Sequence, residues 1–219
     1  MNGPRGMPPA KREDLVRVLR TAGVDDPRVL ESFERVAREA FVPPESRNLA
    51  YYDMPVPIAH GQVTTQPSLM ATMVQALRLK GHERVFEIGT GLGFETAILA
   101  CLCREVISIE WFADLCEEAR ANLEQAGVRN ATIVAGDGSL GWPARAPYDG
   151  IVVAAASPGV SDALIEQLVE GGRLVQPIGP GGDERVTAFV KHSDRLVEAK
   201  VLTGAHFVPL RGACGIVSE

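Results

Sequence analysis

The sequence contains no apolar run long enough to cross a membrane. A spanning helix needs about 18 or more consecutive apolar residues, whereas the longest run, Gly150 to Ala156, has only the length of a strand. Residues Met1 to Ala10 are rich in glycine and proline and lack the apolar core of a secretory signal. Dense blocks of Lys and Arg are also absent, since 22 basic residues stand against 28 acidic ones, and phosphate backbones are bound through clustered cations. We therefore expect a cytoplasmic protein that binds neither membranes nor nucleic acid.

Cysteine is scarce and is not arranged for metal binding. No Cys-x-x-Cys pair occurs, and no histidines follow at zinc-finger spacing, among Cys101, Cys103, Cys116 and Cys214. We expect four reduced thiols and no bound metal.

The overall composition is typical of globular proteins. Hydrophobic residues make up 46% and charged residues 23% of the 219-residue chain, close to globular averages, and this length favours one domain. We predict a single domain over 1–219 with a flexible tail over 1–10. Helices and a long loop are expected over 11–80, an α/β core over 81–180 and C-terminal strands over 181–219.

Apolar residues recur at helical spacing in the first third of the chain. Such stripes predict helices from Arg12 to Ala22 and from Pro27 to Glu39. Prolines from Pro43 to Pro57 predict an extended stretch without regular pairing. Pro67 is then well placed at the first position of a helix that ends at Gly81.

From residue 84 onward, strand and helix patterns alternate. Strands are predicted over 84–88, 105–110, 131–135, 148–155 and 173–178, and helices over 94–102, 112–126 and 160–169. Residues 185–191 and 196–202 resemble a hairpin that extends one sheet edge. This alternation predicts an α/β fold, a doubly wound and mostly parallel sheet with an antiparallel C-terminal edge and extra N-terminal helices.

A glycine-rich loop joins the first predicted strand to its helix. In sheets of this kind, ligands bind beyond the carboxyl ends of the strands, where the strand order reverses. The loop reads G-x-G-x-G through Gly89, Gly91 and Gly93, and Phe94 stands where the dinucleotide fingerprint G-x-G-x-x-G requires its last glycine. The spacing therefore disfavours a dinucleotide.

Acidic residues end or follow three successive predicted strands. Glu87 lies beside the glycine loop, where a carboxylate repels pyrophosphate but attracts a ligand with an ammonium and a sulfonium. Glu110 is placed to accept hydrogen bonds from ribose hydroxyls, and Asp137 can accept from an adenine amino group. Taken singly, each is equally a loop acid that caps the following helix. Together they favour S-adenosylmethionine and a Rossmann-like methyltransferase fold.

Further motifs lie on both sides of this core. They are Ala50-Tyr51-Tyr52-Asp53, Pro57-Ile58-Ala59-His60-Gly61-Gln62, Thr64-Thr65-Gln66-Pro67, Gly136-Asp137-Gly138 and Phe207-Val208-Pro209-Leu210. In this order they resemble the protein-L-isoaspartate (D-aspartate) O-methyltransferase family over nearly the whole chain. The His-Gly-Gln and Phe-Val-Pro-Leu segments are the specific parts of the resemblance.

The resemblance implies methyl esterification of the free carboxylate of L-isoaspartyl residues in peptides and proteins. The ester then closes to a succinimide, whose hydrolysis partly restores aspartate. It also implies a monomer that uses S-adenosylmethionine, releases S-adenosylhomocysteine and holds no metal. Cofactor contacts are expected from Gln62, Thr64, Glu87, Gly89, Thr90, Gly91, Gly93, Glu110, Trp111, Asp137 and Gly138. Substrate contacts are expected from His60, Thr65, Gln66, Val208 and Leu210.

Thr65 is the expected catalytic residue and the main departure from the family pattern. The family usually has a serine there, whose hydroxyl orients the acceptor carboxylate. Threonine keeps the hydroxyl but adds a methyl group and a stiffer side chain, which narrows the pocket. Leu92, Phe94 and Ala154 depart from the family pattern as well.

Three alternatives stay open at this point. An aspartyl O-methyltransferase dedicated to one peptide would use the same chemistry as a biosynthetic tailoring step that drives aspartimide formation. A non-catalytic module that binds the cofactor or a partner would bind without turnover. A dinucleotide oxidoreductase would bind NAD instead of S-adenosylmethionine.

Overall fold

The computed structural model describes residues 11–180 and 182–216. The predicted flexible tail over 1–10 lies outside the described residues. Seven strands form one sheet in the order β3-β2-β1-β4-β5-β6-β7. The strands are β1 (Arg84–Ile88), β2 (Glu105–Glu110), β3 (Ala131–Ala135), β4 (Tyr148–Val153), β5 (Leu168–Ile178), β6 (Glu184–His192) and β7 (Arg195–Ala205).

The first five strands run parallel, and β6 pairs antiparallel with both β5 and β7, which confirms the predicted fold class. Ser193 and Asp194 join β6 to β7 with φ values of 50° and 62°. Two successive left-handed residues are the geometry of the tight hairpin turn that matches strand twist. The order reverses between β1 and β4, so the loops that follow these two strands diverge and leave room for a ligand.

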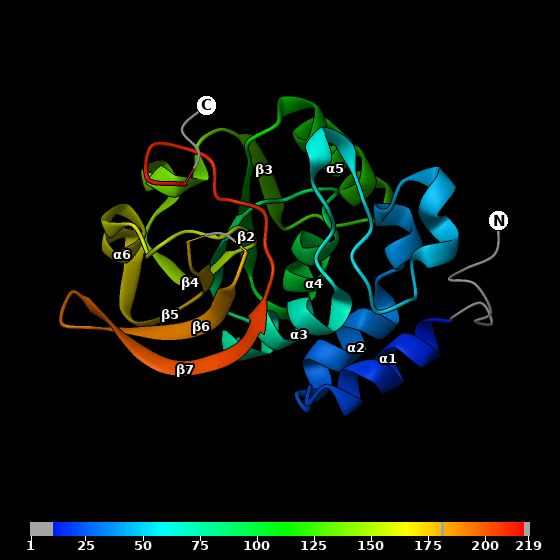
Figure 1. The fold of residues 1–219 in the computed structure, drawn as a ribbon, viewed down its shortest axis with the longest axis horizontal. Coiled ribbons are helices and arrows are strands. Elements are labelled where there is room, and N and C mark those ends of the chain that lie inside the picture. The colour runs from blue at the N-terminus through cyan, green and yellow to red at the C-terminus, as the bar shows by residue number, and fades with distance from the viewer. Residues whose placement is uncertain (1–10, 181, 217–219) are drawn as a thin grey trace.

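Helices cover both faces of the sheet. They are α1 (Arg12–Thr21), α2 (Pro27–Arg35), α3 (Pro67–Ala76), α4 (Phe94–Leu102), α5 (Ala113–Gln125) and α6 (Asp162–Gln167). Short 3-10 turns occupy η1 (Arg38–Phe41), η2 (Pro44–Leu49), η3 (Ala59–Gly61), η4 (Gly138–Leu140) and η5 (Pro143–Arg145). Figure 1 shows α1 and α2 together on the side of the view opposite the β6–β7 hairpin tip.

The central strands carry near-continuous apolar sequence because both of their faces are buried. In β1, Val85 belongs to the core shared with α1 to α5, whereas Phe86 and Ile88 belong to the core on the other face, beside α6. Phe33 of α2 contacts Phe94 at the start of α4 edge-on, with ring centroids 5.6 Å apart. The N-terminal helices therefore pack directly against the helix that follows the glycine loop.

Several predicted boundaries were wrong, each for a local reason. The second helix ends at Arg35 rather than Glu39 because Val36 is extended, and α3 ends at Ala76 because Arg78 adopts a φ of 54°. The predicted helix over 160–169 ends at Gln167, since Leu168 pairs with Tyr148 in the sheet. The stretch from Pro43 to Pro57, predicted to be extended, contains the 3-10 turn η2.

Within the described ranges, no helix combines the length and the apolar character needed to cross a bilayer. The described cysteines, Cys101, Cys103, Cys116 and Cys214, are all free thiols.

Candidate functional site

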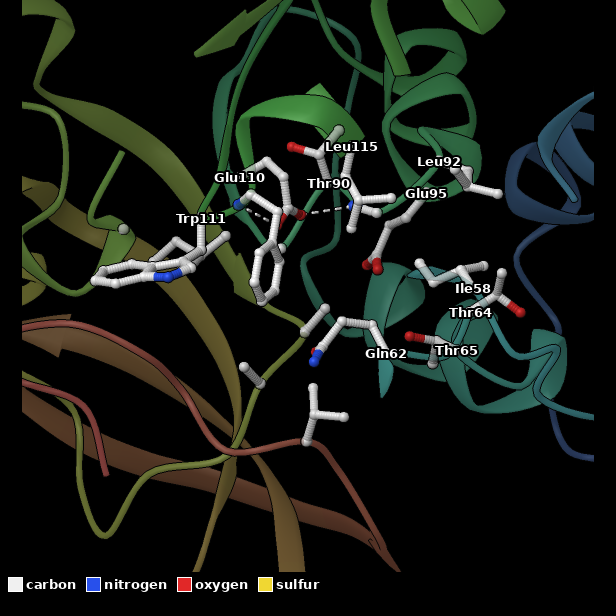
Figure 2. A pocket seen from close by; sticks show the side chains of 18 of the residues that line it. Ile58, Gln62, Thr64, Thr65, Thr90, Leu92, Glu95, Glu110, Trp111 and Leu115 are labelled. Carbon is white, nitrogen blue, oxygen red and sulfur yellow. Dashed lines mark hydrogen bonds between the residues drawn. The ribbon is translucent and has the colours of Figure 1, made fainter. Parts of the chain in front are cut away.

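A cavity lies at the carboxyl ends of β1, β2 and β4, as the sheet topology predicts. It encloses about 860 Å³ of space between protein atoms, part of which is open to solvent. Its walls come from the glycine loop, the loop after β2, the segment 58–65 and the C-terminal chain at 208–211. Figure 2 shows these segments facing one another around the open space.

The glycine loop forms the floor of this cavity. Gly89 and Gly91 line it with φ values of 95° and 54°, a region that side chains with a Cβ rarely adopt. Across the floor, a Cβ on Gly138 would stand 2.5 Å from a methyl of Ile88. Gly93 lies outside the cavity, because it begins α4 and packs against Leu123 of α5.

Glu110 presents a carboxylate to the cavity at the end of β2. It accepts hydrogen bonds from the backbone N–H groups of Gly91 (2.9 Å) and Phe112 (3.0 Å), drawn as dashed lines in Figure 2. Burial raises the pKa of Glu110, although these N–H groups favour the ionised form. A carboxylate oxygen holds more lone pairs than one N–H uses, so Glu110 can still accept from a ligand diol. Trp111 and Thr90 line the cavity beside it.

Glu87 is not among the residues that line the cavity, and the expected direct contact with a ligand cation stays a prediction. Its side chain has no solvent exposure, and its Oε2 accepts a hydrogen bond of 2.5 Å from Thr96 Oγ1. Strand side chains alternate between faces, so Glu87 lies on the face of Val85, toward α4. Burial raises the pKa of this carboxyl.

Glu95 is the carboxyl that enters the cavity on that side, and it was missed in the sequence. It lies in the first turn of α4, lines the cavity and is 4% exposed, and its Oε1 has no hydrogen-bond partner. Burial, and then the neighbouring Glu87, raise the pKa of Glu95 well above its ordinary value. The available signal was one charged residue within an otherwise uncharged and mostly apolar helix, 94–102.

Asp137 is not among the residues that line the cavity, although its neighbours Gly136 and Gly138 are, and the expected contact with an adenine stays a prediction. Its Oδ1 accepts from the N–H (2.9 Å) and hydroxyl (2.6 Å) of Ser139, and its Oδ2 accepts from the N–H of Ala213 (2.8 Å). The first of these bonds caps η4, the alternative that was open in the sequence. The bond from the N–H of Ala213 attaches the C-terminal segment to the loop after β3.

Thr64 and Thr65 face opposite ways. Figure 2 shows the Thr65 hydroxyl directed into the cavity and the Thr64 hydroxyl directed away from it. The Thr64 hydroxyl accepts hydrogen bonds of 3.0 Å from Arg38 Nη2 and 3.0 Å from the N–H of Val56. Thr64 therefore lines the cavity, but its hydroxyl is already engaged in hydrogen bonds within the protein.

Arg38 is a second residue that the sequence did not single out. Its guanidinium, 1% exposed, donates to the carbonyl oxygens of Ala50 (2.9 Å), Tyr52 (3.1 Å) and Met54 (3.2 Å) as well as to Thr64. Burial lowers its pKa to about 10, so it stays charged at neutral pH. The buried Arg38 guanidinium thus fixes, through these four hydrogen bonds, the segment from Ala50 to Thr64 that leads into Thr65.

A groove adjoins the cavity on the side of β7 and α3. Gln66 lies in this groove, where its amide donates to Asp53 Oδ2 at 2.9 Å, and Phe207 forms part of the opposite wall. The residues shared by cavity and groove mark where the two meet, namely Val63, Thr64, Thr65, Ala154 and Val208. A ligand in the cavity and a chain in the groove would approach each other at Thr65.

His60 lines neither the cavity nor the groove, and the substrate contact expected of it stays a prediction. Its Nε2 lies 2.7 Å from Asp114 Oδ2, and its ring stacks on Phe112 at 4.1 Å. It therefore ties η3 to the start of α5. Gln62, two residues on, does line the cavity, and Leu210 lines the cavity from the C-terminal chain.

The lining residues can bind and orient a ligand but do not form a nucleophile and base. None of the described residues that line the cavity is a His, Cys, Ser or Lys. Among residues 11–180 and 182–216, no cluster of three or more His, Cys, Asp or Glu side chains could hold a metal ion. The open backbone at Gly89 and Gly91, the diol acceptor Glu110 and the unpartnered Glu95 together fit a polar ligand with a cationic group.

Comparisons with known proteins agree on one family. The profile of the protein-L-isoaspartate(D-aspartate) O-methyltransferases matches residues 10–214. A protein-L-isoaspartate O-methyltransferase of Methanoculleus marisnigri is 45% identical over 95% of both chains. A second, from Marinobacter nauticus, is 48% identical over 93% of this chain and 94% of the relative.

Solved structures show the same fold. One protein-L-isoaspartate O-methyltransferase, 30% identical, superposes with a TM-score of 0.82 over 94% of this chain and 67% of the other. A Plasmodium falciparum structure, 21% identical and described as a putative enzyme of this kind in complex with S-adenosyl-L-homocysteine, superposes with a TM-score of 0.78 over 91% of this chain and 97% of the other. The chain therefore belongs to the protein-L-isoaspartate(D-aspartate) O-methyltransferase family.

Proposed function

We propose that this protein transfers a methyl group from S-adenosylmethionine to the free carboxylate of L-isoaspartyl residues in peptides and proteins, which initiates repair through a succinimide. The observation that carries the proposal is the junction of cavity and groove at Thr65. A methyl donor in the cavity and a peptide in the groove would bring donor and acceptor together there.

The chain's residues supply positioning rather than acid–base chemistry. Bound S-adenosylmethionine supplies a methyl group on a sulfonium, which an ionised carboxylate attacks without a general base. Glu110 would accept hydrogen bonds from the ribose hydroxyls of the cofactor, and the glycine loop would let the cofactor approach the protein backbone closely. The side chains of Val63 and Val208 line the junction and Ile58 lines the cavity beside it, so the walls there are largely apolar. In-line positioning then provides most of the rate enhancement.

The Thr65 hydroxyl donates a hydrogen bond that orients the acceptor carboxylate. We expect Thr65→Ser to retain activity and Thr65→Ala to lower kcat/KM by about 10- to 100-fold, because one charge-assisted hydrogen bond contributes roughly 1.5–3 kcal/mol. Steady-state methylation of an isoaspartyl peptide measures both variants. A fully active alanine variant would show that the hydroxyl does not orient the acceptor.

A matched pair of synthetic peptides, identical except for an L-isoaspartyl or an L-aspartyl residue, tests the proposed acceptor. With methyl-labelled S-adenosylmethionine, label should enter the isoaspartyl peptide only. The curated relatives named above are isoaspartate methyltransferases, which favours general repair over a dedicated tailoring step. A gene for a precursor peptide next to this gene would favour tailoring instead.

Action as a monomer in the cytoplasm, without nucleic acid, stays a prediction. The free thiols at 101, 103, 116 and 214 are compatible with a reducing compartment.

A further inference from the structure

Glu95 places an unpartnered carboxyl inside the cavity. Its side chain is 4% exposed and lines the cavity, and its Oε1, like the Oε1 of Glu87 outside the cavity, has no hydrogen-bond partner. In Figure 2 the carboxylate reaches the open space in the half of the view that holds Ile58 and Thr65, while Glu110 and Trp111 lie in the other half. A buried acceptor without a partner is costly for a fold, so a ligand group that completes it is the simplest account of its retention.

The two carboxyls that line the cavity are not equivalent. Glu110 is tied to backbone N–H groups on both oxygens, which fixes it as an acceptor for hydroxyls. Glu95 has no such donors, and a buried carboxylate without donors is stabilised best by a cation. The structure therefore presents a diol acceptor at one end of the glycine loop and an anion without a counter-ion at the other.

We infer that the Glu95 carboxylate binds the α-ammonium group of the cofactor. This inference rests on the proposed function, because the cofactor carries its ammonium on the amino-acid end, away from the ribose that Glu110 would hold. The ammonium of a zwitterionic amino acid is the one group of that end that is both cationic and a hydrogen-bond donor. The role once expected of Glu87 thus passes to the residue eight positions further along the chain.

The charges around Glu95 determine its protonation before the ligand binds. Glu87 of β1 is the anion coupled to it, and Glu110 contributes a further anion at the cavity wall. The cations nearby are committed elsewhere, because Arg38 of η1 binds the substrate-side segment and the Arg211 guanidinium stacks over the Phe112 ring at 5.3 Å. His60 of η3 lies against Asp114.

Two buried carboxyls that repel each other do not ionise together, so one of the pair holds a proton in the ligand-free protein. Burial and Glu87 raise the pKa of Glu95, and an ammonium beside it lowers that pKa again. Ligand binding should therefore release a proton. Because the ligand binds the ionised form, affinity should rise with pH above the ordinary glutamate pKa of about 4.3 until the raised pKa is passed.

The test uses two probes that share adenosine and the thioether. S-Adenosylhomocysteine carries the ammonium but no sulfonium, and 5′-methylthioadenosine lacks the amino-acid end. For Glu95→Gln, calorimetry should show affinity for S-adenosylhomocysteine lowered by about 10- to 100-fold, with affinity for methylthioadenosine unchanged within about twofold. Glu118→Gln, an exposed residue of α5, is the matched control and should bind both probes as the original protein does.

Equal loss for both probes, or no loss for S-adenosylhomocysteine, would overturn the ammonium contact. An intact affinity for S-adenosylhomocysteine with a raised KM for the peptide would place Glu95 on the substrate instead and would also overturn it. If the unaltered protein binds neither probe, the proposed function itself fails, which is a separate outcome.

A second measurement uses the unaltered protein and does not depend on a variant that folds. The heat of S-adenosylhomocysteine binding, compared in buffers of different ionisation enthalpy, should reveal release of up to about one proton per ligand. Methylthioadenosine should release measurably less. Equal proton release for the two probes contradicts the inference, because Glu87 and Glu110 would then account for all of it.

Discussion

Replacing Arg38 with methionine should lower the free energy of unfolding by about 3–5 kcal/mol, because it leaves a set of buried acceptors without donors. Methionine fills the space of the arginine stem but offers no N–H group to the carbonyls of Ala50, Tyr52 and Met54 or to Thr64 Oγ1. Each buried acceptor that loses its partner costs about 1–3 kcal/mol, less where water reaches it. Denaturant unfolding followed by circular dichroism measures the difference.

Two further variants give this prediction a control. Arg38→Lys keeps one buried charge but loses the planar fork that serves several acceptors at once, so it should lose less stability than Arg38→Met. Arg35→Met, on the exposed side of α2, should change the free energy of unfolding by less than about 0.5 kcal/mol. An Arg38→Met protein as stable as the original would show that water replaces the guanidinium at no cost.

Glu110→Ala should weaken binding of S-adenosylhomocysteine by about 100- to 10,000-fold. Two hydroxyl-to-carboxylate hydrogen bonds of roughly 1.5–3 kcal/mol each would be lost, and the N–H groups of Gly91 and Phe112 would lose their shared acceptor. Calorimetry measures the change, and Glu118→Ala on the exposed face of α5 serves as control. An affinity within about threefold of the original would remove Glu110 from the binding site.

Glu110 alone does not separate the two cofactor classes, because an acid at this place also binds the ribose of dinucleotides. The unaltered protein should bind S-adenosylhomocysteine and show no binding of NAD. Binding of NAD alone would support the oxidoreductase alternative that the glycine spacing disfavours.

The sequence predicted the middle of the fold closely. The bounds of β1, β2, β3 and α4 agree with the structure at both ends, because short apolar runs with glycine or charged residues at their ends leave little choice of boundary. The end of α6 could not be read, since Leu168 continues the apolar stripe of a helix but pairs with Tyr148 in the sheet. Tertiary pairing, not local preference, decides that boundary.

The glycine loop that the sequence predicted as a ligand site lines the cavity, whereas Glu95 was not predicted. The glycine spacing indicated where the cavity lies. Which acid enters the cavity depends on the face of the strand or helix from which each side chain projects. Alternation along β1 places Glu87 opposite Phe86 and Ile88, and this was available in the sequence. The roles of Arg38 and Asp137 were not, because both depend on contacts with residues far along the chain.

The most direct test of the proposed function is the ratio of kcat/KM values for the matched isoaspartyl and aspartyl peptides, with S-adenosylmethionine as methyl donor. A site that binds and orients one carboxylate geometry should discriminate by at least about 100-fold in favour of the isoaspartyl peptide. Loss of label from that peptide as methanol should follow as the succinimide forms. Equal rates for the two peptides, or methylation of neither, would contradict the assignment of this protein to isoaspartyl repair.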